Sequence, residues 1–166
     1  MSDITLPIDG GYFNYRVGAI IIHNNRVLMV TNDRFPTYYS IGGRVQFGET
    51  LEDAVLRETY EETQLHFKID RLAFVHENFF RGAHMENKPF HELSFFFLMQ
   101  PHADIEKVKC ESVTSEGVKE WADWLPIDGL DEYALYPEFF KTELRDLQPN
   151  VRHFVTRNDK TRRVGA

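Results

Sequence analysis

The sequence has 166 residues, of which 42% are hydrophobic and 14% aromatic, so it can bury one sizeable core and is not a disordered chain. Its formal net charge of −7 argues against a diffuse attraction to nucleic acid or to an anionic membrane surface. Cys110 is the single cysteine, which excludes an internal disulfide and a thiolate metal cluster.

We expect one cytoplasmic domain spanning residues 1–166, with a core from about 12 to 145 and a polar C-terminal tail from about 156 to 166. The N-terminal MSDITLPIDGG is acidic and lacks the basic and apolar regions of a targeting segment. The apolar runs AIII and SFFFLM have the length of strands and are too short to cross a bilayer. The single cysteine also suits a reducing compartment.

The first half of the chain begins with a predicted hairpin. YRVGAIII (15–22) and RVLMVT (26–31) are rich in β-forming residues and flank the turn HNN. NDRFPTYYSIGG (32–43) then predicts a loop that leads into a helix.

The second half predicts further strands and one more helix. RLAFVHENFF (71–80) and HELSFFFLMQ (91–100) indicate paired strands, and the continuous apolar run of the second indicates a central position. The polar residues 102–120 predict a loop, 121–130 a short strand and turn, 136–147 a helix and 151–155 an edge strand. This order favours a mixed α/β layered domain over a regular parallel array.

The helix within GETLEDAVLRETYEETQL (48–65) carries an unusual concentration of acids. Thr50 is a plausible N-cap, with Asp53 three residues on, so we expect the helix to begin near Leu51. At roughly 100° per residue, apolar and acidic residues share one stripe. Its members are Leu51, Ala54, Val55, Glu58, Glu62 and Leu65, with Glu61 at the border.

A helix that docks its apolar residues would carry Glu58 and Glu62 toward the protein. An ordinary solvated face is the alternative, but it fits this stripe poorly. Carboxylates that are partly buried and repel one another need a compensating positive charge. A divalent cation such as Mg²⁺ binds carboxylate oxygens and can bridge substrate phosphates, so the pattern indicates a metal site.

The segment GGRVQFGETLEDAVLRETYEETQL resembles the Nudix box, the signature of the Nudix hydrolases. Its seven matching positions keep the spacing of the box over 23 residues without a gap: Gly43, Glu49, Arg57, Glu58, Glu61, Glu62 and Leu65. The resemblance implies an α/β fold of the Nudix type, an α/β/α sandwich with a mixed β-sheet. It also implies a pyrophosphohydrolase that cleaves a nucleoside diphosphate linked to another group.

Three positions depart from the box. Thr59 replaces an aliphatic residue, Ile41 replaces a proline that often precedes the glycines, and Gln64 replaces a glycine just after the helix. If the family backbone is kept, Gln64 adopts a positive φ at a cost of about 1 to 2 kcal/mol. Every charged position survives, which favours an active enzyme.

The resemblance assigns roles to the residues of the box. Glu58, Glu61 and Glu62 become ligands of Mg²⁺ or Mn²⁺, with the Gly42 carbonyl as a further ligand, and Arg57 and Glu49 become an internal ion pair. The metal would polarise the diphosphate and lower the pKa of an attacking water, so that water attacks phosphorus.

Residues outside the box complete the predicted site with less specificity. Glu116 and Glu120 are candidates for a further catalytic acid, with Glu77 and Glu92 ranked lower; solvated loop acids are the alternative. Arg16 and Arg44 are candidates for phosphate contacts, or else serve ordinary ion pairs. Three aromatic residues could stack on a base or belong to the core: Phe35, Tyr38 and Tyr39.

Two other functions remain open at this point. A non-catalytic nucleotide-binding or regulatory module would need the fold but not the acids. A prenyl diphosphate isomerase would need a cysteine near the site, and Cys110 lies at an unmatched position. The expected partner is a small nucleoside diphosphate derivative, with neither nucleic acid nor membrane, and the family resemblance makes a homodimer possible.

Overall fold

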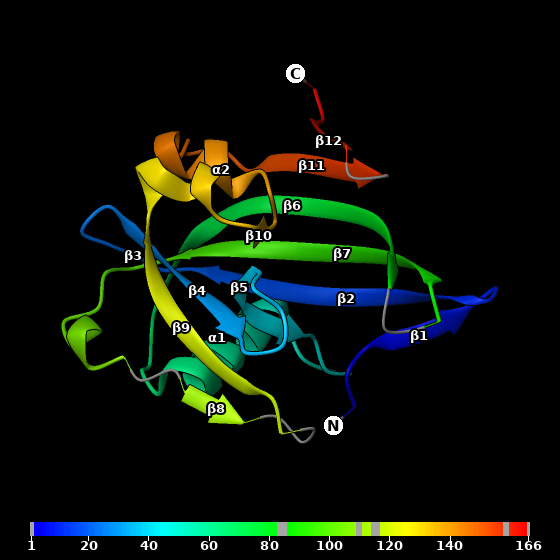
Figure 1. The fold of residues 1–166 in the computed structure, drawn as a ribbon, viewed down its shortest axis with the longest axis horizontal. Coiled ribbons are helices and arrows are strands. Elements are labelled where there is room, and N and C mark those ends of the chain that lie inside the picture. Colours follow the sequence, from blue (N-terminus) through cyan, green and yellow to red (C-terminus); the bar gives the residue numbers. More distant parts are fainter. Residues whose placement is uncertain (1, 83–85, 109–110, 114–116, 158–159, 166) are drawn as a thin grey trace.

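The strands form one mixed sheet with short helices on both faces (Figure 1). The computed structural model describes residues 2–165 except 83–85, 109–110, 114–116 and 158–159. Within these residues the strand order is β12-β11-β6-β7-β2-β5-β4-β9-β8, while β1, β10 and β3 pair with β2, β5 and β4. The strands are β1 (Thr5–Ile8), β2 (Gly11–Ile20), β3 (Ile22–His23), β4 (Arg26–Asn32), β5 (Tyr38–Arg44), β6 (Ile69–Gly82), β7 (Lys88–Met99), β8 (Glu111–Val113), β9 (Lys119–Pro126), β10 (Leu135–Tyr136), β11 (Arg152–Arg157) and β12 (Lys160–Arg163).

Two hydrophobic clusters on opposite faces of the sheet build the layers. The helices are α1 (Leu51–Thr63) and α2 (Phe140–Glu143), with 3-10 turns η1 (Ile105–Lys107), η2 (Ile127–Glu132) and η3 (Leu144–Asp146). Ala54 and Val55 of α1 pack with Ala19, whereas the neighbouring Ile20 packs with Phe140 of α2. Successive residues of a strand point to opposite faces, so β2 contributes to both clusters. The expected α/β/α sandwich with a mixed sheet is confirmed.

Several strands follow the sequence-based expectations. β6 and β7 pair antiparallel, and β7 lies between β6 and β2, as its continuous apolar run predicted. The predicted hairpin of 15–22 with 26–31 forms only next to its turn, where β3 pairs with β4 and Asn24 and Asn25 both have positive φ. Most of the first run lies in β2, which pairs with β7 and β5 instead.

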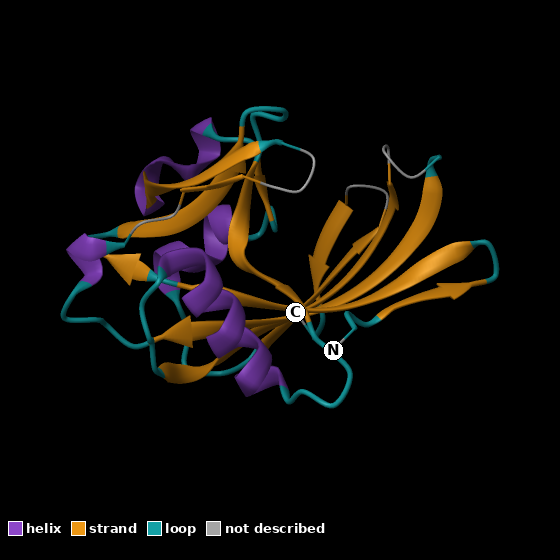
Figure 2. Ribbon diagram, turned by 90° about the horizontal axis from the view of Figure 1, so that it is seen from below, coloured by secondary structure: helices purple, strands orange, loops and turns teal. Residues whose placement is uncertain are grey.

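The predicted loop before the helix is in part a central strand. Residues 38–44 form β5, whose first residues pair with β4 and β10 and whose last four pair with β2. β5 joins β2 to β4 in the strand order, and Figure 2 shows that the strands of the sheet spread into two diverging groups. The sequence YYSIGGR did not predict this strand, because serine and glycine have low strand propensity and the strand depends on partner strands on both sides.

Three further expectations need correction. The predicted loop 102–120 contains η1, β8 and the first residues of β9, while Cys110 lies outside the described residues. The predicted helix 136–147 is shorter in the structure, where only α2 and η3 are helical within this range. β11 is not an edge strand, since β12, within the expected tail, pairs with it.

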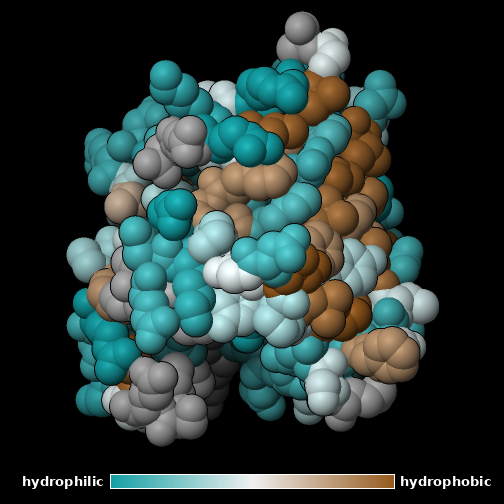
Figure 3. All heavy atoms as spheres, turned by 90° about the vertical axis from the view of Figure 1, so that its right-hand side faces the viewer, coloured by the Kyte–Doolittle hydropathy of each residue, from teal (hydrophilic) through white to brown (hydrophobic). Residues whose placement is uncertain are grey.

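The end of the sheet that faces the viewer in Figure 3 carries a band of hydrophobic side chains. β1 and the β6–β7 hairpin lie toward this end (Figure 1). Leu6 and Ile8 of β1 and Phe80 of β6 are exposed large apolar residues.

Candidate active site

Local sequence fixes both ends of α1. Thr50 caps the N-terminus, where its hydroxyl accepts a hydrogen bond from the Asp53 N–H at 3.1 Å, so the helix begins at Leu51 as predicted. At the other end Gln64 has φ 60°, and its N–H donates to the Tyr60 carbonyl at 2.8 Å. Gln64 therefore has the left-handed conformation that the resemblance led us to expect at this glycine position of the box.

Two of the three predicted metal acids turn toward the protein. The Glu58 side chain is 15% exposed, and Oε2 of Glu62 is buried without a hydrogen-bond partner among the described residues. Gly43 of β5 makes room for Glu58, because a Cβ at Gly43 would lie 2.4 Å from the Glu58 carboxyl carbon. The two carboxylates thus reach the strand that carries the glycines.

The surroundings of these acids disfavour their charged forms. Burial raises the pKa of Glu62 to about 8, and the carboxylates of Glu58 and Glu120 add to the rise. A hydrogen bond from the Gly42 backbone and the charge of Arg16 oppose it. Burial also raises the pKa of Glu58, against the lowering effect of Arg57. A cation placed between Glu58 and Glu62 would offset both the cost of burying the two charges and their mutual repulsion.

Arg57 holds the loop that precedes α1 against the helix. Its Nε and Nη2 donate to the two Glu49 oxygens at 2.7 and 2.9 Å, and Nη1 donates to Glu58 at 2.7 Å. Nη2 also donates to the Arg44 carbonyl at 3.1 Å. The expected Arg57–Glu49 ion pair is therefore part of a wider clamp, and its hydrogen bonds lower the pKa of Glu49.

The N-terminal segment braces the same loop. The Ile4 N–H donates to the Val45 carbonyl at 2.9 Å, and the Phe47 N–H donates to the Ser2 carbonyl at 3.1 Å. Asp3 forms an isolated bridge with Gln46. The loop that carries Glu49 is thus bonded on both sides.

Glu61 differs from the other two acids. Its side chain is 56% exposed, and its carboxylate lies 3.4 Å from Arg57 Nη1. Within the described residues, no three His, Cys, Asp or Glu side chains are grouped closely enough to hold a metal ion. The structure brings Glu58 and Glu62 together and leaves Glu61 at the rim.

The donor set nevertheless fits a divalent cation that prefers oxygen. Glu58 and Glu62 offer only carboxylate oxygens, and in the part of the chain that the structure describes no donor reaches the buried Oε2 of Glu62. Such a cation would neutralise this pair and polarise a bound diphosphate.

The predicted residues outside the box divide into near and distant groups. Glu120 of β9 raises the pKa of Glu62 and so lies within its electrostatic reach, whereas Glu116 falls outside the described residues. Glu77 pairs with His153 at 2.8 Å. Glu92 lies 3.7 Å from Arg16. Of these four acids, Glu120 is named by its effect on the pKa of Glu62 as a neighbour of the candidate site.

The charge of Arg16 acts both on the acids and on Tyr39. Arg16 lowers the pKa values of Glu58, Glu62 and Tyr39, in each case against a larger effect of burial. Tyr39 is 44% exposed and stacks on Tyr136 of β10 with ring centroids 6.1 Å apart. Sequence reasoning missed Tyr136, which becomes a neighbour only through the parallel β5–β10 pair.

The other basic and aromatic candidates have structural partners. Arg44 pairs with Asp3 at 3.8 Å, and its carbonyl accepts from Arg57. Tyr38 donates to Asp123 at 2.9 Å and packs against the core. Phe35 is half-buried, and its N–H donates to the Asn32 side chain.

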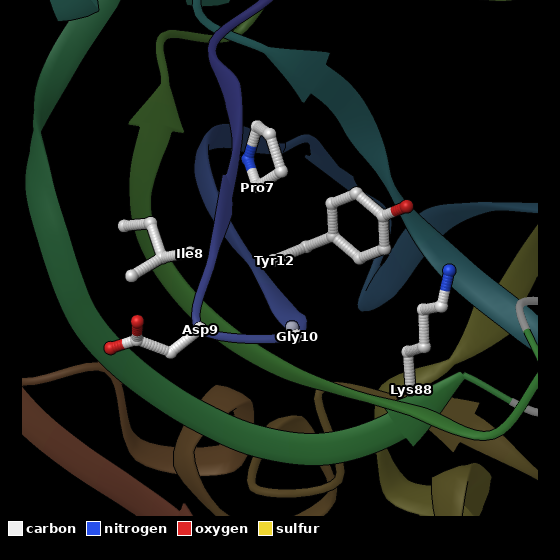
Figure 4. Close-up of a pocket in the computed structure, with 7 residues that line it drawn as sticks. Pro7, Ile8, Asp9, Gly10, Tyr12 and Lys88 are labelled. Carbon is white, nitrogen blue, oxygen red and sulfur yellow. The ribbon is translucent and has the colours of Figure 1, made fainter.

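A cavity of about 240 Å³ lies away from these residues, at the turn between β1 and β2 (Figure 4). Its lining contains none of the predicted site residues. The lining consists of Pro7, Ile8, Asp9, Gly10, Gly11, Tyr12 and Lys88. We therefore place the candidate site at the α1 carboxylates.

Comparisons with known proteins agree with the fold and with the box. The family model for the NUDIX domain matches residues 13–145, so the chain belongs to the NUDIX family, and the predicted resemblance to the Nudix hydrolase family is confirmed. A MutT-like protein from Streptomyces ambofaciens is 26% identical over 115 residues, which cover 69% of this chain. The match spans 64% of that relative's length.

Solved structures share the fold at low sequence identity. A MutT protein from Bacillus halodurans has a TM-score of 0.68 at 19% identity, covering 92% of this chain and 99% of the other. A NUDIX hydrolase from Nitrosomonas europaea has a TM-score of 0.54 at 19% identity, covering 80% and 86%. Among the described residues, no helix has the length and apolar character needed to span a membrane.

Proposed function

We propose that the protein is a metal-dependent hydrolase that cleaves the diphosphate linkage of a nucleoside diphosphate derivative by attack of water at phosphorus. The observation that carries this proposal is the largely buried pair Glu58 and Glu62, within a Nudix box that keeps every charged position. Oε2 of Glu62 has no hydrogen-bond partner among the described residues. Burial raises the pKa values of both largely covered carboxylates, and the charge of Glu58 adds to the rise at Glu62, so the pair forms a site for a cation.

In this proposal Glu58 and Glu62 bind Mg²⁺ or Mn²⁺, with the Gly42 carbonyl as a further ligand. Glu61 would join them after turning from the solvent and releasing Arg57. The bound metal would neutralise the diphosphate and lower the pKa of the attacking water. Arg57 and Glu49 hold the loop against the helix.

Other side chains would orient the substrate and the water. Glu120 is the preferred further acid, because its charge acts on Glu62; Glu116 stays a candidate by sequence alone. Arg16 would contact phosphate, and Tyr39 would offer its exposed ring to the base. Arg44 is a weaker phosphate candidate because it pairs with Asp3.

A cytoplasmic location is also proposed, on the basis of the single cysteine. The net charge of −7 supports a small-molecule substrate over nucleic acid or a membrane surface. A homodimer stays a prediction that light scattering can test.

The proposal is tested with a panel of nucleoside triphosphates, ADP-ribose, dinucleoside polyphosphates and nucleotide sugars in Mg²⁺. Hydrolysis in ¹⁸O-labelled water identifies the phosphorus that is attacked. We expect turnover of at least one compound, and a loss of roughly 10² to 10³ in kcat for Glu62→Gln. A Glu62→Gln enzyme with the turnover of the wild type would refute the assignment.

A further inference from the structure

A polar cluster joins β2 to β7 beside the candidate site. Asn14 lies opposite Glu92 in the parallel register of these strands, and Arg16 lies opposite Ser94. Asn14 and Ser94 are 3% and 4% exposed, although both occupy positions in a sheet with an apolar core. Buried polar side chains are costly unless they are paired, so their partners indicate what the cluster does.

The partners of Asn14 and Ser94 converge on Glu92. Asn14 Nδ2 donates to Glu92 Oε2 at 3.3 Å, and Ser94 Oγ donates to Oε1 at 3.4 Å. Thr5 of β1 donates to Asn14 Oδ1 at 2.9 Å, which directs the amide nitrogen of Asn14 toward Glu92. The Glu92 side chain is only 13% exposed, so these contacts fix its carboxylate.

The fixed carboxylate faces Arg16. Glu92 Oε2 lies 3.7 Å from Arg16 Nη1, which is an ion pair but exceeds hydrogen-bond length. Arg16 is 38% exposed and carries five N–H donors, so this contact holds the charge in place without consuming the donors.

Arg16 also acts on the acids of the candidate site. Arg16 lies opposite Arg44 in the antiparallel β2–β5 register, next to the Val17–Gly43 pair, and the Glu58 carboxylate packs on Gly43. Burial is the largest influence on the pKa values of Glu58 and Glu62, which it raises, and the charge of Arg16 lowers both. If Glu92 lost its charge, these two carboxylates would be the competing anions for Arg16. A guanidinium paired with them would occupy the place of the metal cation.

We infer that Glu92, fixed by Asn14 and Ser94, is a positioning residue that holds Arg16 away from Glu58 and Glu62 and directs it to the substrate phosphate. This inference rests on the proposed function, because it assumes that these two glutamates bind the metal. It replaces the role of further catalytic acid that the sequence left open for Glu92.

The test measures Mn²⁺ binding without substrate, by the electron paramagnetic resonance signal of free Mn²⁺. Glu92→Gln should weaken binding roughly three- to tenfold, within the range of coupling between neighbouring charges. Arg16→Ala should bind Mn²⁺ at least as tightly as the wild type. The double variant Glu92→Gln, Arg16→Ala should recover the affinity of Arg16→Ala, which a merely structural role of Glu92 would not allow.

Glu77→Gln is the matched control, since Glu77 forms a hydrogen bond with His153 on a neighbouring strand, and this variant should leave Mn²⁺ affinity unchanged. With the best substrate of the panel, Glu92→Gln should raise KM by a larger factor than it lowers kcat. If melting shows that Glu92→Gln does not fold, Ser94→Ala serves as the second variant. It should lose less Mn²⁺ affinity than Glu92→Gln, and adding Arg16→Ala should again restore that affinity.

Unchanged Mn²⁺ affinity in Glu92→Gln, or a double variant as weak as Glu92→Gln alone, would overturn the inference and leave the proposed function standing. A wild-type protein that binds no Mn²⁺ would overturn both. Mn²⁺ binding with the expected rescue, but without hydrolysis of any panel compound, would support the positioning role and count against the proposed reaction.

Discussion

Replacing Glu62 with glutamine should remove a pH dependence of stability from the metal-free protein. Burial raises the pKa of Glu62 to about 8 from its usual 4.5, so the folded protein keeps this proton at pH values at which the unfolded chain has released it. The stability that the protonated carboxyl contributes is complete below pH 4.5 and is lost as the pH rises through about 8.

The size of the effect follows from the two pKa values. One pKa unit corresponds to about 1.4 kcal/mol, so raising the pH from about 6 to about 9 should cost the wild type about 2 to 3 kcal/mol through Glu62. In a domain of this size that loss lowers the melting temperature by roughly 5 to 10 °C. Glutamine has nearly the same shape and still offers an oxygen to the Gly42 N–H, so the variant should lack this part of the slope.

The assay is thermal melting in EDTA across this pH range for the wild type, for Glu62→Gln and for Glu52→Gln. Glu52 is an exposed acid in the first turn of the same helix, so its variant controls for the loss of one charge. The difference between the wild type and Glu62→Gln isolates Glu62 from the other titrating groups. Parallel pH profiles for these two proteins would refute the argument that burial keeps Glu62 protonated.

Four further outcomes are expected. Mg²⁺ or Mn²⁺ should raise the melting temperature of the wild type, but not that of a variant with glutamine at 58, 61 and 62. Gly43→Ala should melt almost normally without metal and lose the metal-dependent rise, because the new Cβ displaces the Glu58 carboxylate; a retained rise would contradict this geometry. Arg57→Ala should lose about 2 kcal/mol in urea unfolding, as well as turnover, since the largely covered Glu49 loses its cation and keeps only the hydrogen bond from the Gln46 N–H; unchanged stability would argue against the clamp. Gln64→Gly should raise the free energy of unfolding by less than about 1 kcal/mol, because relief of the strain at positive φ is offset by loss of the side-chain hydrogen bonds to the Tyr60 and Glu61 carbonyls. A lower free energy of unfolding in urea would show that the backbone strain is small.

The sequence predicted the elements whose determinants are local. Thr50 with Asp53 fixed the start of α1, and the apolar run of 91–100 indicated a central strand. β5 could not be predicted in the same way, because its two glycines and its serine disfavour a strand until β2 and β4 supply hydrogen bonds on both sides. Hydrogen bonds to strands that are distant in sequence therefore determine that residues 38–44 form a strand.

In the candidate site, too, some features could be predicted from the local sequence and others depend on the tertiary structure. The apolar stripe of the helix predicted that Glu58 and Glu62 turn inward, and the resemblance to the Nudix box implied that Arg57 meets Glu49. Spacing along a helix does not specify that Glu61 faces solvent while Arg57 bonds Glu58 as well, since that outcome depends on where the preceding loop lies. The cluster around Glu92 likewise arises from the register of β2 and β7, which the sequence pattern does not contain.

The brace between the N-terminal segment and the loop before α1 matters for how the protein is expressed and shortened. Terminal residues are usually the first to be trimmed and the preferred place for an affinity tag. Here the backbone of Ser2 and Ile4 bonds to Phe47 and Val45, next to the glutamate that Arg57 holds. Cutting the chain before β1 would free one side of that loop while leaving every box residue in place. A tag is better attached after β12, whose exposed residues form the outer strand of the sheet.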